Sequence, residues 1–130
     1  MSQPKWLKQS VIEVIHAMQI GEHGGLPGIR DQGLLNSALA RPKNLYQYQE
    51  ADLFQIAACY AHSLVSNHPF ADGNKRTALL ATYTFLHING IHLTASEADA
   101  TIKVTALAAG DIYEQEFADW IKQNTVPEKH

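Results

Sequence analysis

His68-Pro-Phe-Ala-Asp-Gly-Asn-Lys-Arg76 joins two apolar segments of this chain. In both segments the apolar side chains recur at three- and four-residue steps, which is the spacing of one face of an α-helix. Asp52 is a suitable N-cap for the first segment, and Pro69 prevents its helix from continuing past His68. Asn89-Gly90 is a typical stop for the second helix. The sequence therefore predicts two long helices connected by a short polar loop.

Helical periodicity also precedes this pair of helices. Residues 6–20 carry one apolar stripe, and the glycines and proline of residues 21–28 are expected to end that helix in a turn-rich loop. Asp31 is expected to cap a short second helix that ends at Arg41-Pro42, since proline disfavours the helical conformation of the residue before it. Two helices are therefore predicted upstream of Asp52.

The remaining segments complete a prediction of an all-α fold with about six helices. Ser96 and Asp111 are expected to cap two further helices toward the C-terminus. Residues 43–50 alternate apolar and polar side chains, which favours a small flap or hairpin between the second and third helices. Residues 126–130 are predicted to form a loose C-terminal tail, which leaves residues 1–125 as a single domain.

Composition narrows the classes of function. The formal net charge is -3, whereas a protein that binds nucleic acid directly usually carries a basic excess. The lone cysteine, Cys59, excludes a disulfide within the chain and fits a reducing compartment. No apolar run has membrane-spanning length, and the first residues lack a signal-peptide pattern. We therefore expect a cytoplasmic protein that binds neither nucleic acid nor a membrane.

The polar loop combines several features of an anion-binding site. Gly73 can adopt a positive φ angle, which allows the backbone N–H groups to curl around one point. The helix after it begins with Asn74, Lys75 and Arg76, whose backbone N–H groups have no partner within the helix. Two cations at the positive end of a helix are unfavourable unless an anion joins them. The loop is therefore predicted to bind phosphate groups.

Three further side chains of the loop suggest phosphate-transfer chemistry. Asp72 offers a carboxylate, and a Mg²⁺ ion held by a nucleotide needs only one or two such protein ligands. His68 stands at the mouth of the loop, and histidine is the commonest general base in enzymes. Phe70 is apolar within a polar loop, so we expect it to plug into the core and fix the loop's shape. The loop thus predicts an enzyme that transfers a phosphate-containing group from a nucleotide.

The same nine residues resemble the signature of the Fic/Doc family, His-x-Phe-x-(Asp or Glu/Ala)-x-Asn-x-Arg, and especially its death-on-curing (Doc) branch. Residues 24–31 and 34–42 are similar to the N-terminal part of Doc-type toxins. The resemblance implies a compact all-α core that uses ATP, or another nucleoside triphosphate, together with Mg²⁺. It also implies a toxin that lacks its own inhibitory helix and is paired with a separate antitoxin, whose disordered segment folds onto the toxin.

The resemblance assigns roles to individual residues. His68 would deprotonate a hydroxyl of the target protein, Asp72 would hold Mg²⁺, and Asn74 and Arg76 would grip phosphates. Lys75 and Arg76 would also act in catalysis, and Gly73 and Lys75 would belong to the phosphate-binding set. A flap that aligns the target chain as an added strand corresponds to Leu45, Tyr46, Gln47 and Tyr48. His16 lies among apolar residues of the first helix, and the sequence offers no function for it.

The reaction type depends on the loop's variable positions. Asp72 and Lys75 are similar to the Doc form, which phosphorylates a threonine of elongation factor Tu and so inhibits translation. Gly73 and Pro69 are similar to the Fic form, which transfers AMP to a target hydroxyl. A protein kinase is therefore the favoured interpretation. A protein adenylyltransferase and a catalytically idle module that only binds anions are the alternatives.

Overall fold

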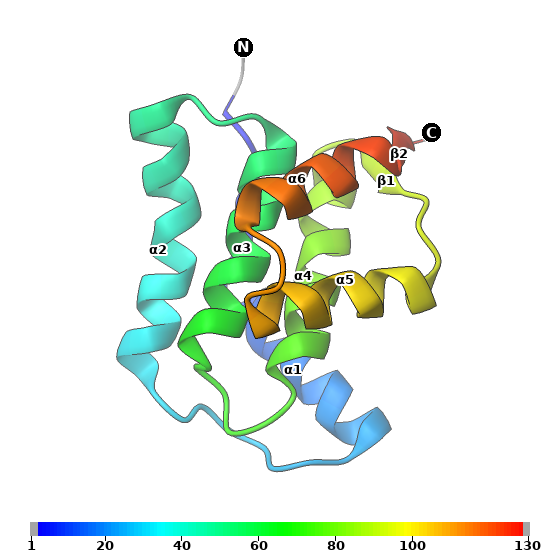
Figure 1. Cartoon of the computed structure of the whole chain (residues 1–130). Helices are drawn as coiled ribbons and strands as arrows, with labels where there is room; N and C mark the ends of the chain where they lie inside the picture. Colours follow the sequence, from blue (N-terminus) through cyan, green and yellow to red (C-terminus); the bar gives the residue numbers. More distant parts are fainter. Residues whose placement is uncertain (1–2, 129–130) are drawn as a thin grey trace.

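The structure, a computed structural model, describes residues 3–128. Within these residues six helices and two short strands follow one another along the chain (Figure 1). Their bounds are α1 (Gln9–His23), α2 (Gln32–Gln49), α3 (Leu53–Asn67), α4 (Asn74–Ile88), β1 (Ile91–Leu93), α5 (Glu97–Ala109), α6 (Glu114–Gln123) and β2 (Thr125–Pro127). The fold is all-α, as predicted.

Helix α3 is the centre of the fold, and α2, α4, α5 and α6 all pack against it. Nine of its residues are buried, among them Ile56, Tyr60 and Leu64. The Asp52 side chain caps it by accepting a hydrogen bond from the Gln55 backbone N–H at 2.8 Å. Because α3 is apolar on nearly every side, it is a buried helix rather than an amphipathic surface helix.

Two predictions about the segment that forms helix α2 are wrong. The helix does not end at Arg41-Pro42, and residues 43–50 do not form a flap or hairpin; one helix runs through both segments as far as Gln49. An apolar series at helical spacing continues through the proline: Leu35, Ala38 and Pro42 are buried, and Leu45 is half-buried. Burial of this stripe against α3 outweighs the backbone hydrogen bond that a proline removes inside a helix.

The helix boundaries agree with most of the predicted caps. Asp31 accepts a hydrogen bond from the Leu34 N–H, and Ser96 does the same for Asp99. The prediction that Asp111 caps the last helix is wrong, since α6 begins three residues later. There the Glu116 side chain accepts a hydrogen bond from the Tyr113 backbone N–H at 3.0 Å, and Tyr113 takes the N-cap position.

The C-terminal segment also differs from the prediction of a loose tail. Strand β2 pairs antiparallel with β1, placing Val126 opposite His92, and the Glu128 N–H donates to the Gly90 carbonyl at 2.8 Å. Residues 126–128 are therefore ordered by backbone pairing, while residues 129 and 130 lie outside the described part of the chain.

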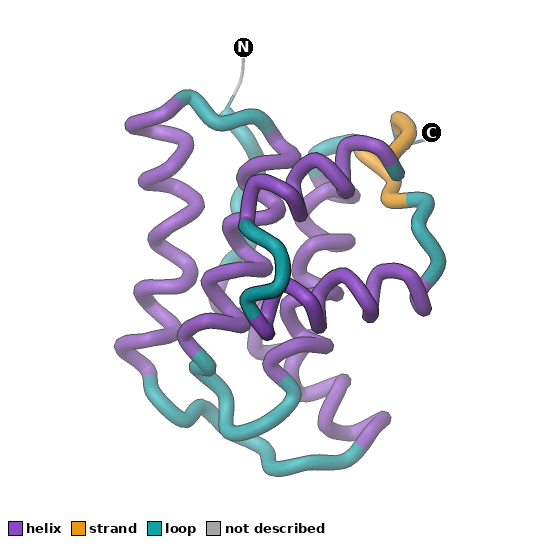
Figure 2. The backbone as a smooth tube through the Cα atoms, in the orientation of Figure 1, coloured by secondary structure: helices purple, strands orange, loops and turns teal. Residues whose placement is uncertain are grey.

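Two connections meet at one end of the helical bundle, drawn at the bottom of Figures 1 and 2. One joins α1 to α2 and the other joins α3 to α4. The Pro69 carbonyl accepts hydrogen bonds from the N–H groups of Arg30 and Asp31, at 2.7 and 3.1 Å, and Ile29 forms a β-bridge with Phe70. The first connection therefore supports the loop that carries the polar motif.

Candidate active site

The motif loop (residues 68–76) is shaped by backbone conformations at its two ends. Asn67 is the last residue of α3, and His68 adopts a left-handed conformation with φ 48° at its C-cap. Gly73 is also left-handed, with φ 75°, and is the N-cap residue of α4. A left-handed histidine stores backbone strain, and such strain persists only where the surroundings hold it in place.

Side-chain contacts hold that conformation. The Asn74 side chain, only 8% exposed, accepts a hydrogen bond from the Phe70 N–H at 3.1 Å and donates one to the Phe70 carbonyl at 3.0 Å. Arg30 donates from Nε to the His68 carbonyl at 2.7 Å and from Nη2 to the Asn67 carbonyl at 2.9 Å. The Asn74 side chain therefore braces the loop, which leaves its backbone N–H as the group of this residue that could bind an anion.

Phe70 is buried, as expected, and its ring lies on a residue that sequence reasoning left without a function. The His16 imidazole of α1 stacks on the Phe70 ring at a centroid distance of 3.9 Å and an interplanar angle of 9°. His16 Nε2 lies 2.8 Å from the backbone carbonyl of Asp72. The one signal for His16 in the sequence was its position among apolar residues, which does not indicate a partner 56 residues away.

The start of α4 has the electrostatics of an anion-binding site. The Thr77 N–H donates to the Gly73 carbonyl at 3.0 Å, so the three N–H groups before it have no partner within the helix. No side chain caps this end, and the first turn contains no acidic residue. Lys75 and Arg76 are exposed and form no ion pair within residues 3–128. Helix dipole and side chains thus add positive charge at one point.

These groups line a cleft of about 450 Å³, a volume within the usual range for small-molecule sites. The motif loop forms one wall. The facing wall comes from α5, which sequence reasoning did not include in the site. The cleft is lined by His68, Ala71, Asp72, Gly73, Asn74, Lys75, Arg76, Leu79, Thr101, Val104 and Thr105. Nothing in the local sequence marks the α5 residues as neighbours of the loop, since only tertiary packing brings them there.

Asp72 fits a metal site that a nucleotide completes. Its carboxylate accepts N–H groups from Gly73 at 2.9 Å and from Leu26 at 3.3 Å, which leaves lone pairs on both oxygens. A Cβ at Gly25 would approach Asp72 Oδ2 to 2.7 Å, so the glycine allows this close approach. In the described residues no three histidine, cysteine or acidic side chains are grouped to hold a metal. A Mg²⁺ ion at Asp72 would therefore need phosphate and water as its other ligands.

His68 stands at the edge of the same cleft. Its side chain is exposed, and its Nδ1 lies 3.5 Å from Asn74 Nδ2. The structure thus brings together the predicted nucleotide and metal residues of the loop: His68, Asp72, Gly73, Asn74, Lys75 and Arg76. The predicted flap residues do not form an extended segment; Leu45, Tyr46, Gln47 and Tyr48 lie in the last turns of α2. A helix offers no free strand edge, so these residues cannot align a target as an added strand.

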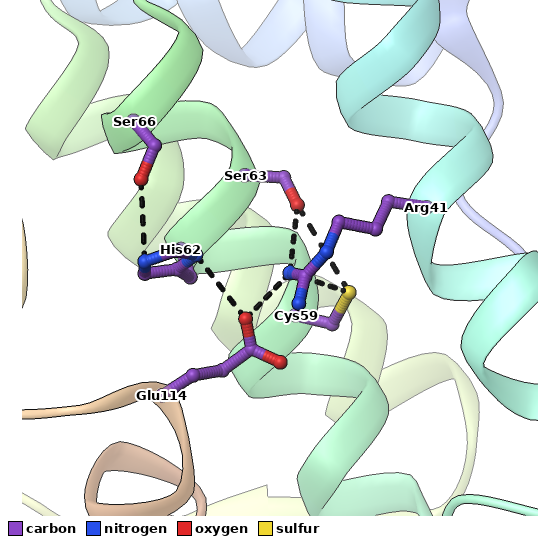
Figure 3. A network of polar contacts seen from close by, with 6 residues as sticks. All are labelled: Arg41, Cys59, His62, Ser63, Ser66 and Glu114. Atoms are coloured by element: carbon purple, nitrogen blue, oxygen red, sulfur yellow. Dashed lines mark hydrogen bonds and ion pairs between the residues drawn. The ribbon is translucent and has the colours of Figure 1, made fainter. Parts of the chain in front are cut away.

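A second polar group lies away from the loop, between α2, α3 and α6. We call Arg41, Cys59, His62, Ser63 and Glu114 the Arg41 cluster (Figure 3). Arg41 Nη1 and His62 Nδ1 both contact Glu114 Oε1, the latter at 3.2 Å, and Arg41 Nη1 also lies 3.3 Å from Ser63 Oγ.

The electrostatics of the Arg41 cluster are balanced within the chain. The hydrogen bond to Glu114 raises the pKa of Arg41, because the carboxylate stabilises the charged guanidinium. Burial raises the pKa of the Cys59 thiol to about 11, since the low-dielectric interior disfavours the thiolate. The cluster therefore holds a paired cation and a neutral thiol, and neither requires an external ligand.

The described part of the chain contains no helix with the length and apolar character needed to cross a bilayer.

Comparisons with known proteins agree with the geometry of the loop. A sequence model described as the Fic/DOC family matches residues 6–86. The chain is 36% identical over 110 residues to "Protein kinase doc" of Escherichia phage P1, covering 84% of this chain and 86% of that protein. It is also 49% identical over 74 residues to "Toxin Doc" of Mycolicibacterium smegmatis, covering 55% of this chain and 57% of that relative. With this match and the motif loop forming one wall of the cleft, this chain belongs to the Fic/Doc family.

Proposed function

We propose that this chain is a toxin that transfers the γ-phosphate of ATP to a serine or threonine hydroxyl of another protein. The observation that carries the proposal is the positive charge that Lys75 and Arg76 add at the start of α4, in the same cleft as His68 and the Asp72 carboxylate. Phosphoryl transfer depends mainly on positioning and charge neutralisation, and these groups supply both. The similarity to a relative named as a protein kinase supports the same reaction.

Each group of the cleft would have one task. His68 would accept the proton of the target hydroxyl as its oxygen bonds to the γ-phosphorus, and the bond from that phosphorus to the β,γ-bridging oxygen would break to release ADP. Arg76, Lys75 and the backbone N–H groups of residues 74–76 would hold the phosphate oxygens. Asp72 would hold Mg²⁺, which when bound neutralises phosphate charge. Asn74 and Arg30 would keep the loop in its strained form.

The label test distinguishes the possible reactions. The protein is incubated with Mg²⁺ and ATP labelled at either the α or the γ phosphate, with purified elongation factor Tu and, separately, with cell extract. Kinase activity transfers only the γ label. Transfer of only the α label would reject the kinase and establish a nucleotidyltransferase. If neither label is transferred while ATP still binds, the chain is an idle anion-binding module.

Adenylyl transfer remains the second candidate because Gly73 leaves the phosphate-binding turn without a side chain. Its φ of 75° places the backbone at the edge of the cleft, where an α-phosphate could approach closely. The Lys75→Gly variant tests this candidate, since it removes from the cleft the side chain that is similar to the Doc form. A kinase should lose γ transfer in that variant, whereas an adenylyltransferase should keep or increase α transfer.

The toxin and antitoxin roles extend the proposal to the cell. The relative named "Toxin Doc" supports a toxin, and we expect this toxin to be paired with a separate antitoxin. Expression of the chain alone should stop growth and translation, whereas the His68→Ala variant should not. Co-expression with a small neighbouring gene that encodes a DNA-binding head and a disordered tail should restore growth. Growth arrest that persists in the His68→Ala variant would show that catalysis is not the cause.

A further inference from the structure

His16 is a buried polar residue that the proposed chemistry does not use. It lies on α1 and is 4% exposed. Its Nε2 is 2.8 Å from the backbone carbonyl oxygen of Asp72. A carbonyl oxygen only accepts hydrogen bonds, so the Nε2 atom of His16 carries the proton and donates it. The imidazole therefore has a fixed partner in the motif loop.

The motif loop packs against α1 through His16 and its neighbour Ile20. One ring face stacks on Phe70 at 3.9 Å. A Cβ built at Gly73 would lie 3.8 Å from the His16 ring and 3.3 Å from Ile20 Cδ1, so the glycine backbone rests directly on α1. The ring thus has two separable interactions with the loop, a stacking contact and a donated hydrogen bond.

The hydrogen bond acts on the peptide group that joins Asp72 to Gly73. His16 holds the oxygen of this group, while the Asp72 carboxylate accepts the Gly73 N–H at 2.9 Å on the other side. A peptide group is planar, so fixing its oxygen also fixes the direction of its N–H. The orientation of the Asp72 carboxylate in the loop therefore depends on a residue of α1.

We propose that His16 is a positioning residue that orients the Asp72 carboxylate and the Gly73 backbone for a metal–nucleotide complex. The metal–nucleotide complex in this inference rests on the proposed function. The hydrogen bond from His16 to the loop is present without any ligand. It resembles the general case in which an outer group orients a metal-binding side chain, where loss of that group typically costs about 10–100-fold in affinity or activity.

Two variants separate the interactions of the ring. His16→Phe keeps a flat ring that can stack on Phe70 but removes the donor. His16→Gln keeps an amide N–H that can reach the Asp72 carbonyl but removes the ring. A purely structural role predicts that phenylalanine, the better core residue, replaces His16 and that glutamine does not. The positioning role predicts that glutamine replaces His16 and that phenylalanine does not.

The first measurement is made without nucleotide. The backbone ¹⁵N order parameter of Gly73 is expected to be about 0.85 in the wild type and in His16→Gln, as for rigid backbone. In His16→Phe it is expected to fall below about 0.6, the level of a flexible segment. A value in His16→Phe equal to that of the wild type would overturn the proposal, whatever the chain catalyses.

The second measurement compares ATP affinity in excess Mg²⁺ with ATP affinity in EDTA, by calorimetry. We expect His16→Phe to reduce the gain in affinity due to Mg²⁺ roughly 10-fold, while His16→Gln keeps most of it. Arg30→Gln is the matched control, since Arg30 holds the His68 end of the loop, and it should leave the Mg²⁺ gain unchanged. An equal loss in His16→Phe and Arg30→Gln would contradict a specific action on Asp72.

The two proposals can fail separately. If the wild type binds no nucleotide under any condition, the proposed function falls, and the order parameter alone decides whether His16 holds the loop. If the wild type binds ATP with a Mg²⁺ gain that both His16 variants share, the nucleotide site stands and the role of His16 falls.

Discussion

The motif loop and the Arg41 cluster contain similar side chains, yet their charges are arranged in opposite ways. In the Arg41 cluster, Glu114 lies between Arg41 and His62 and neutralises the guanidinium within the chain. In the motif loop, Lys75 and Arg76 meet the positive end of α4 with no acidic residue in that turn. A balanced cluster stabilises the fold by itself, whereas an unbalanced one gains stability from a bound anion. Charge balance distinguishes the two regions better than residue type does.

The strongest test of this contrast is His68→Ala. We expect the rate of γ-phosphate transfer to fall by about 10²–10⁴-fold, because general-base assistance is lost. The melting temperature should change little, since the His68 side chain is exposed and alanine keeps the Cβ that strains the left-handed backbone. Single-turnover kinetics and calorimetry measure the two effects. A transfer rate within a factor of two of the wild type would remove His68 from the proposed chemistry.

Arginine substitutions in the two regions give the next largest effect. Arg76→Ala should weaken ATP binding by about 10–100-fold, because charged hydrogen bonds to phosphate contribute about 1.5–3 kcal/mol. Arg41→Ala should leave ATP affinity unchanged, since the Arg41 guanidinium already forms an ion pair with Glu114. Calorimetric titration with ATP measures both variants. Equal losses of affinity would mean that the Arg41 cluster also takes part in nucleotide binding.

Alkaline pH should affect the stability of the fold through the Arg41 cluster. The Cys59 thiol has an ordinary pKa of 9.0 and a pKa raised to about 11 by burial. The thiol of the unfolded chain ionises at a lower pH than the buried thiol of the folded chain. The stabilising contribution of the protonated Cys59 to the free energy of unfolding is therefore complete below pH 9 and is lost as pH rises to about 11. The free energy of unfolding should therefore fall by up to about 2–3 kcal/mol over this window.

Denaturant titrations between pH 8 and 11 measure that fall, with Cys59→Ser as the control because a serine hydroxyl does not titrate there. Tyr60, whose pKa burial raises to about 12, should cause the same additional loss above pH 10 in both proteins. A pH dependence that is identical in the two proteins would show that Cys59 is not responsible.

The smallest effect is expected for Glu114→Gln. Arg41 and His62 would lose their shared carboxylate, but all three side chains are partly exposed, so the free energy of unfolding should fall by no more than about 1 kcal/mol. Urea denaturation of Glu114→Gln, Arg41→Gln and the double variant isolates the interaction. Phosphate transfer should not change. A large loss of transfer with normal stability would connect the cluster to the active site.

The motif loop could be predicted because its determinants are local. Pro69 ends one helix, Gly73 allows the left-handed turn that starts the next, and the cations follow directly. The path of α2 was mispredicted because Pro42 is a local signal to stop, whereas the apolar spacing through Leu35 and Ala38 continues. The α5 wall of the cleft carried no local signal at all.

By itself the sequence determined the all-α class, the caps at Asp31, Asp52 and Ser96, and the residues of the motif loop. These features depend on backbone preferences and hydrogen bonds that span only a few positions. Only the tertiary structure decided that α2 runs through Pro42 and that His16 lies beneath Asp72. Both outcomes come from burial against distant segments, and the free energy of that burial can exceed the local cost of about 3 kcal/mol for a proline within a helix.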